Sequence, residues 1–188
     1  MRKVFLIKSI HVMLMFLISS CTIIQEIDTI GTSDSPDTMK SYLYGRFFQS
    51  ALYVFRLGII IQDVTTKKEY RIPFDHDRFL FFKAKEVLTV VLQPGTYRIK
   101  SFYAMKGDAF GPLIYEDSFK DQKFDRTIEI QSGKAYYIGD YEGKSYMVYY
   151  QRVEWFLSNV KDNYDTTTAK FREQYKKFDN IETVNIWK

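Results

Sequence analysis

The stretch VLTVVLQPGTYRI, residues 87–99, decides the fold class. Its first six residues form an apolar run with the length of a strand that is covered on both faces. Pro94 fixes φ at the second position of a tight turn, and Gly95 accepts a positive φ at the third. The sequence therefore predicts two β-strands that are joined by a turn at Pro94-Gly95.

Similar patterns recur on both sides of this stretch. Residues 130–141 (IQSGKAYYIGDY) predict a turn at Ser132-Gly133, and residues 141–150 (YEGKSYMVYY) predict a turn at Glu142-Gly143. Strands that are joined by two-residue turns lie antiparallel. With the earlier β-type runs at 42–49 and 53–64, eight or nine strands at this spacing predict a single antiparallel β-sandwich.

Only the C-terminal part has the period of a helix. Residues 164–178 place three aromatic side chains on one face, and Asp165 is a suitable N-cap. Residues 181–187 are compatible with a final strand. The aromatic stripe consists of Phe171, Tyr175 and Phe178.

The first 20 residues have the order of a bacterial secretory signal. Three basic residues precede the apolar run at 10–18, which is followed by two serines and the only cysteine of the chain, Cys21. The run is shorter than the roughly 20 residues that a spanning helix needs. We expect residues 1–20 to form a signal helix that is cleaved between Ser20 and Cys21.

Residues 18–21 (ISSC) resemble a lipobox, the recognition site of bacterial lipoprotein signal peptidase. The resemblance implies that Cys21 carries a diacylglyceryl group on its sulfur and an acyl chain on its nitrogen. Several chains hold a protein on a membrane, where one chain is marginal. Thr22 stands where a retention signal would have Asp, which by resemblance implies the outer membrane. The alternatives are an ordinary cleaved signal with an incidental cysteine, or an N-terminal membrane anchor.

The mature chain is expected to consist of a tether and one domain. The later part of residues 22–40 is rich in turn residues, so residues 21–40 are predicted to be a lipidated flexible tether. Residues 41–188 suffice for one domain with a sizeable core. Without residues 1–20 the chain has 24 basic and 23 acidic residues. This balance lacks the basic surface of a nucleic-acid-binding protein.

The stretches VVLQPGTYRIKSF and IEIQSGKAYYIGDY resemble small bacterial lipoprotein domains of unknown function. Those domains share an immunoglobulin- or transthyretin-like sandwich, so the resemblance implies that fold for most of the mature chain. The matched positions form turns and core, and the family has no agreed catalytic residues. They are Pro94, Gly95, Tyr97, Gly133, Tyr136, Tyr137, Ile138 and Gly139.

The mature chain offers few reactive groups. Its one histidine, His76, lies between Asp75 and Asp77, and we interpret this stretch as an exposed polar loop because a metal site needs more ligands from spaced positions. A lone cysteine excludes an intramolecular disulfide. We expect no metal, no cofactor and no catalysis. A glycosidase-like pair of carboxylates is the alternative. The acids available for it are Glu116, Asp117, Asp140 and Glu142.

Residues 134–156 are dense in aromatic side chains. On an exposed sheet face, rings can stack on sugars or anchor a protein partner, which makes Tyr137, Tyr141 and Tyr146 candidate contact residues. Tyrosine is also a normal core residue of strands, and we favour that interpretation. The loop at 105–113 is the other candidate contact surface, because loops carry binding on sandwich scaffolds.

These observations predict a lipid-anchored, non-catalytic binding or structural module of the cell envelope. We expect it at the outer membrane, on a face that the sequence leaves open, with a protein or glycan as partner and no nucleic acid. The alternatives are an envelope hydrolase that uses a carboxylate pair, and a periplasmic assembly factor that contacts another envelope protein through a sheet edge.

Replacing Cys21 should abolish membrane attachment. In the Cys21→Ala variant the sulfur that would carry the diacylglyceryl group is missing, so the protein should be unprocessed or soluble. Detergent phase partitioning of cell extracts measures this directly. Partitioning that does not change with the substitution would contradict the prediction.

Overall fold

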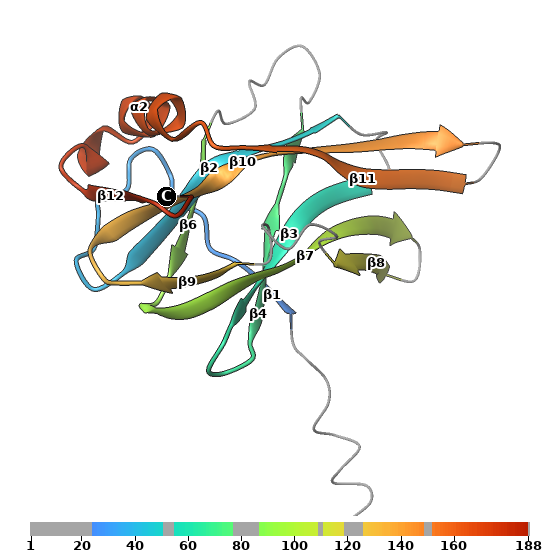
Figure 1. Ribbon diagram of the computed structural model, residues 1–188, viewed down its shortest axis with the longest axis horizontal. Helices are drawn as coiled ribbons and strands as arrows, with labels where there is room; N and C mark the ends of the chain where they lie inside the picture. Colours follow the sequence, from blue (N-terminus) through green and yellow to red (C-terminus); the bar gives the residue numbers. More distant parts are fainter. Residues whose placement is uncertain are drawn as a thin grey trace, which may run out of the picture.

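The computed structural model describes residues 24–50, 55–76, 87–108, 111–118, 126–148 and 152–187. Among these residues two sheets pack together, most residues are in strands, and one α-helix lies near the C-terminus (Figure 1). The predicted β-sandwich with one C-terminal helix is therefore confirmed. Among the described residues, no helix is long and apolar enough to cross a membrane.

Each sheet contains six strands. The first sheet has the order β1-β4-β3-β7-β8, with β9 also paired to β7, and the second has the order β11-β10-β2-β5, with β12 paired to β10 and β6 to β2. The strands of the first sheet are β1 (Ile24–Glu26), β3 (Phe55–Asp63), β4 (Glu69–Pro73), β7 (Gly95–Asp108), β8 (Gly111–Ser118) and β9 (Thr127–Ile130). Those of the second are β2 (Ser41–Ser50), β5 (Asp75–His76), β6 (Leu88–Leu92), β10 (Lys134–Val148), β11 (Arg152–Lys161) and β12 (Glu182–Asn185).

The turns at Pro94-Gly95 and Ser132-Gly133 connect the two sheets and do not form hairpins. β6 pairs with β2 in the second sheet, whereas β7 pairs with β3 in the first, and β9 and β10 are likewise in different sheets. Gly133 has the expected positive φ of 72°, but Gly95 does not have one. Because the chain changes sheets at these corners, the second sheet is mixed: β10 is parallel to β2 and β12.

The turn predicted at Glu142-Gly143 is wrong. β10 continues through these residues to Val148, with only a shift in its register against β11. Gly143 instead lies in the core, where a Cβ would come within 2.8 Å of Leu57 Cδ1. Glycine is needed here because side chains from the other sheet approach the backbone closely. In the sequence, such a glycine cannot be distinguished from a glycine in a turn.

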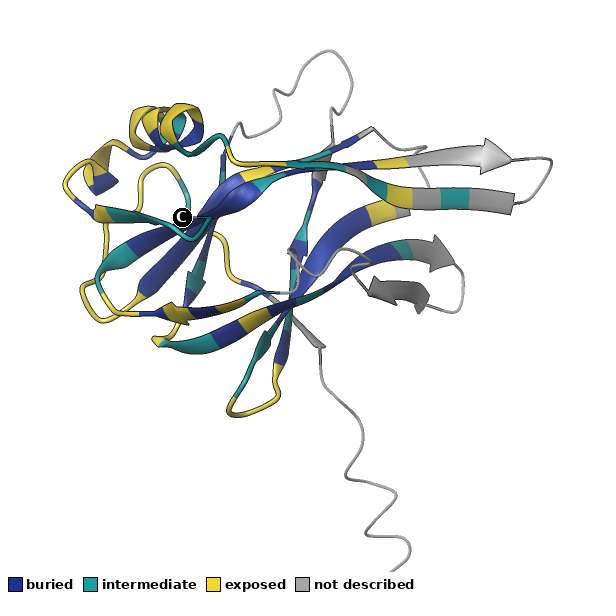
Figure 2. Cartoon of the chain, viewed as in Figure 1, coloured by how far each residue is buried: buried dark blue, intermediate teal, exposed yellow. Residues whose placement is uncertain are grey.

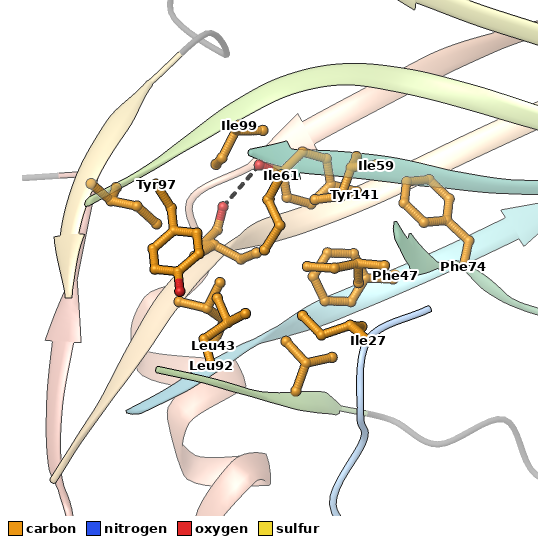
Figure 3. Close-up of a cluster of buried hydrophobic side chains, with 14 of the residues drawn as sticks. Ile27, Leu43, Phe47, Ile59, Ile61, Phe74, Leu92, Tyr97, Ile99 and Tyr141 are labelled. Carbon is orange, nitrogen blue, oxygen red and sulfur yellow. Dashed lines mark hydrogen bonds between the residues drawn. The ribbon is translucent and has the colours of Figure 1, made fainter. Parts of the chain in front are cut away.

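An inter-sheet core fills the space between the two sheets (Figure 3). The rings of Phe47 and Tyr141 stack in it with centroids 5.5 Å apart. Tyr97 donates its hydroxyl to the carbonyl oxygen of Gln93 at 3.0 Å, and burial raises the pKa of this phenol to about 12. Polar ends of tyrosines thus find partners at the rim while their rings pack inside.

A second cluster, the helix core, lies between the outer face of the second sheet and α2 (Tyr164–Gln174). The predicted aromatic stripe faces it, since Phe171, Tyr175 and Phe178 are at most 1% exposed, and the opposite face of α2 is exposed (Figure 2). A short 3₁₀ helix (Lys176–Phe178) completes the stripe. The helix begins one residue before Asp165, with Asn163 as its N-cap, so the predicted N-cap is wrong.

Residues 24–40 belong to the folded domain, which corrects the flexible tether predicted for 21–40 and the domain start predicted at 41. β1 pairs with β4, and the N–H of Ile30 donates to the carbonyl oxygen of Thr89 at 3.1 Å. Ile27 lies in the inter-sheet core near Phe47 and Leu92 (Figure 3), and both Ile27 and Ile30 are 6% exposed. Residues 1–23, which include the predicted signal and Cys21, lie outside the described part.

Truncating Ile27 should destabilise the domain. Ile27→Ala removes buried methyl groups from the inter-sheet core, so the free energy of unfolding should fall by about 2–4 kcal/mol in denaturant melts. The control is Thr32→Ala, because Thr32 is exposed in the same segment and should change stability by less than about 0.5 kcal/mol. Equal stability of the two variants would show that the segment is a tether after all.

Candidate functional site

The aromatic residues of β10 whose side chains are described point into the cores. Tyr137 is 0% and Tyr141 is 2% exposed. The hydroxyl of Tyr141 donates to the carbonyl oxygen of Ile138 at 3.0 Å. The rings of these two residues are therefore buried in the cores. Tyr146, the third candidate, lies on β10, but its side chain is outside the described part.

A bulge at Gly139 changes which residues of β10 point to each face of the sheet. Before it, Tyr136 and Ile138 point into the inter-sheet core, and after it Tyr141 points there. Gly139 has φ 119°, and the register against β2 shifts between Tyr137 and Gly139. Because alternation restarts with the opposite phase, Asp140 is turned to the outer face of the sheet.

The carboxylate of Asp140 accepts hydrogen bonds from four neighbours. Its Oδ1 accepts from the backbone N–H of Arg46 at 3.3 Å and from the Tyr137 hydroxyl at 3.2 Å. Its Oδ2 accepts from Asn163 Nδ2 at 3.0 Å, and Thr167 Oγ1 lies 3.0 Å from both oxygens. Asn163 and Thr167 belong to the start of α2, so this carboxylate attaches the helix to β10.

Tyr137 connects three elements, namely β10, the end of β11 and the start of α2. Its hydroxyl accepts the backbone N–H of Asn163 at 2.9 Å and lies 3.1 Å from the carbonyl oxygen of Lys161, to which it can donate. Burial raises the pKa of this phenol far above the usual value. The hydroxyl therefore stays protonated and serves as donor and acceptor at once.

A polar groove lies on the outer face of the second sheet beside the start of α2. It is an open hollow of about 170 Å³ whose floor comes from β2, β10 and β11. Its polar walls contain two positively charged side chains, two carboxylates and two side-chain amides. The lining residues are Arg46, Phe48, Asp140, Tyr141, Glu142, Asn159, Lys161 and Asn163.

Two cations flank the central carboxylate of the polar groove. Cross-strand pairing sets Arg46 of β2 on one side of Asp140 and Lys161 of β11 on the other. Both are exposed, and within the described part of the chain neither side chain has an ion-pair or hydrogen-bond partner. The Asp140 carboxylate is bonded to the start of α2 instead, so the positive charge of these two residues remains available to a ligand.

The other candidate residues do not meet at one site in the described structure. Glu142 lines the polar groove but pairs with Lys144 at 3.4 Å. Glu116 and Asp117 lie on β8 in the other sheet, and their side chains are outside the described part. No group of three His, Cys, Asp or Glu residues that could hold a metal occurs among the described residues.

Two loop predictions are changed by the strands. His76 belongs to β5, which pairs with β2, so the polar loop predicted around it is in part a strand; its side chain is outside the described part. The loop predicted at 105–113 is largely the hairpin of β7 and β8, which pair up to Asp108 and Gly111. Neither stretch contributes to the polar groove.

Sequence reasoning identified Asp140 and Glu142 but missed the cations. Arg46 lies 94 residues before Asp140 in the chain, and only the parallel pairing of β2 with β10 brings them together. No local motif marks such a contact. Comparison with protein-family models, curated proteins and solved structures found no significant match.

Removing the Asp140 carboxylate should loosen α2. Asp140→Ala removes the acceptor of Arg46 N–H, Asn163 Nδ2 and Thr167 Oγ1, whereas the Tyr137 hydroxyl keeps the Lys161 carbonyl oxygen. We expect a loss of about 2–3 kcal/mol in the free energy of unfolding. The matched control is Glu142→Gln on the same face of the same strand, whose exposed ion pair is worth at most about 1 kcal/mol. Denaturant melts followed by far-ultraviolet dichroism compare the two. A loss no larger than that of the control would contradict this anchoring role.

Proposed function

We propose that the protein is a lipid-anchored, non-catalytic binding module of the cell envelope, and that the polar groove is its contact site for an anionic group of a protein or glycan. One observation carries the site. Arg46 and Lys161 present two positive charges that the described residues leave without partners, on either side of a hollow that also offers the amides of Asn159 and Asn163. Guanidinium, ammonium and amide donors together suit a carboxylate or a phosphate.

The state of Asp140 favours binding over hydrolysis. A carboxylate that acts as an acid or base must exchange a proton with a substrate at hydrogen-bond distance. Asp140 already accepts from Arg46, Tyr137, Asn163 and Thr167, so its oxygens serve the fold. This supports a binding module over the hydrolase alternative, for which Asp140 was one of the candidate acids.

The membrane attachment in this proposal rests on the sequence. The lipobox-like residues 18–21 and the single cysteine support a lipid anchor at Cys21 and a place at the outer membrane. Residue 24 already belongs to the folded domain. The anchor would therefore hold the polar groove close to the membrane surface of the envelope.

A second candidate function is assembly through a sheet edge. β11 is ten residues long and ends the order of the second sheet, where it pairs only with β10 among the described strands. A long open edge can add a strand from another chain, and Phe156 on this strand is 42% exposed. This favours the periplasmic assembly factor as the alternative to a groove that binds small anionic groups.

Titration with small anions tests the polar groove. Inorganic phosphate and glucuronate should each shift the amide resonances of β2, β10 and β11 near the groove, with saturable binding. Arg46→Gln and Lys161→Gln should each weaken binding by about fivefold to tenfold, because each removes one cation from an exposed site. Lys176→Gln, the same charge change at an exposed residue outside the groove, is the control. Shifts that are equal in all variants would contradict the proposal.

A further inference from the structure

The anchor point and the folded domain are very close in the chain. β1 begins at Ile24, only three residues after Cys21. Three extended residues reach at most about 11 Å. If Cys21 is lipidated, as the proposed function has it, the domain therefore lies against the membrane surface and is not raised on a tether.

The pairing of β1 fixes which end of the domain faces that surface. β1 runs parallel to β4, with Ile24 opposite Glu69 at the start of β4. The chain therefore enters the domain beside the β3–β4 turn, which covers residues 64–68. In Figure 1 β1 and this turn lie in the lower part of the view, and α2 lies at the opposite, upper side.

The β3–β4 turn is held by its own hydrogen bonds. Asp63 Oδ1 accepts the N–H groups of Thr65 at 2.8 Å and Thr66 at 2.9 Å, and the Lys67 N–H donates to the Asp63 carbonyl oxygen at 2.9 Å. Lys67 adopts φ 61° and closes the turn. The result is a preformed tip on which residues 65–68 are all exposed.

The exposed charge of this tip is positive. Lys67 and Lys68 are both exposed, and the Lys68 ammonium lies 5.1 Å from the centroid of the Tyr70 ring. The neighbouring acids are occupied: Asp63 serves the turn, and Glu69, which is 5% exposed, is bonded to Lys100 Nζ at 2.9 Å. Within residues 63–69 the exposed charged side chains are therefore those of the two lysines.

We propose that the β3–β4 turn rests on anionic lipid headgroups, with Lys67 and Lys68 against the lipid phosphates, and that this contact orients the domain on the membrane. Each lysine close to an anionic surface favours the docked state by roughly fivefold. Two lysines alone would not hold a soluble protein there. With the anchor in place, docking is intramolecular and a weak contact suffices. The docked domain turns α2 and the polar groove away from the membrane.

A fluorophore placed on one side of the domain or on the other tests how the domain is oriented on the membrane. Cys21 is the only cysteine and is blocked when acylated, so Thr66→Cys and Ala169→Cys each introduce one reactive thiol. Thr66 lies in the turn, and Ala169 is exposed on α2. The full-length lipidated protein is labelled with a fluorophore and reconstituted into phosphatidylethanolamine–phosphatidylglycerol vesicles that contain a headgroup-attached quencher.

We expect strong quenching at position 66 and little at 169. Adding Lys67→Gln and Lys68→Gln to the Thr66→Cys protein should lower the docked-to-undocked ratio by roughly thirtyfold. High salt, or vesicles made of phosphatidylcholine alone, should also lower this ratio. A control double variant that also removes two exposed positive charges, Arg172→Gln with Lys176→Gln, should leave quenching at 66 unchanged.

The outcomes separate this orientation from the anchor itself. Vesicle-bound protein with equal quenching at both positions, or with quenching at 66 that survives loss of both lysines, would overturn the orientation and leave the proposed function intact. Protein that stays in the aqueous phase would overturn both. Stronger quenching at 169 than at 66 would mean that the opposite side faces the lipid.

Discussion

Strand β10 has to supply two hydrophobic cores, and the bulge at Gly139 makes this possible. Its first half sends Tyr137 to the helix core and Tyr136 to the inter-sheet core. A strand that kept its phase would bring Tyr141 to the outer face, since it is an odd-numbered residue like Tyr137. The φ of 119° at Gly139 reverses the phase and buries Tyr141 between the sheets. Only glycine combines this φ with the absence of a Cβ, which would lie 2.9 Å from Trp187 Cζ2.

The same bulge creates the candidate site. It turns Asp140 outward at the position where α2 starts, so that the carboxylate meets Asn163 and Thr167. A negative charge at the start of a helix is favourable, because the free N–H groups there carry partial positive charge. The helix thus competes with Arg46 and Lys161 for this carboxylate. Since the helix holds it, Arg46 and Lys161 have no ion-pair partner among the described residues, which is the basis of the proposed anion site.

The fold class followed from the sequence because alternation and turn residues are local signals. Pro94-Gly95 and Ser132-Gly133 were correctly placed as ends of strands, and the stripe of Phe171 was correctly placed on a helix. Which strands pair depends on whether the chain stays in one sheet or crosses to the other at each turn. A turn dipeptide such as Pro94-Gly95 does not determine this. The role of Gly143 was missed for a related reason. A glycine that admits side chains of the other sheet resembles a turn glycine until its neighbours in space are known.

The order of residues 24–40 changes what a lipid anchor can do. A flexible tether would let the domain sample every orientation, so the membrane would only concentrate it. Here Ile24 is paired with Glu69 and Ile27 is buried between the two sheets, so the folded domain begins almost at the proposed anchor, Cys21. If Cys21 carries the proposed lipid, the packing of Ile27 would therefore also restrict the orientation of the domain at the membrane surface. A ligand of the polar groove would then meet a site with a defined height and direction, which lowers the entropy lost on binding a partner that is itself fixed in the envelope.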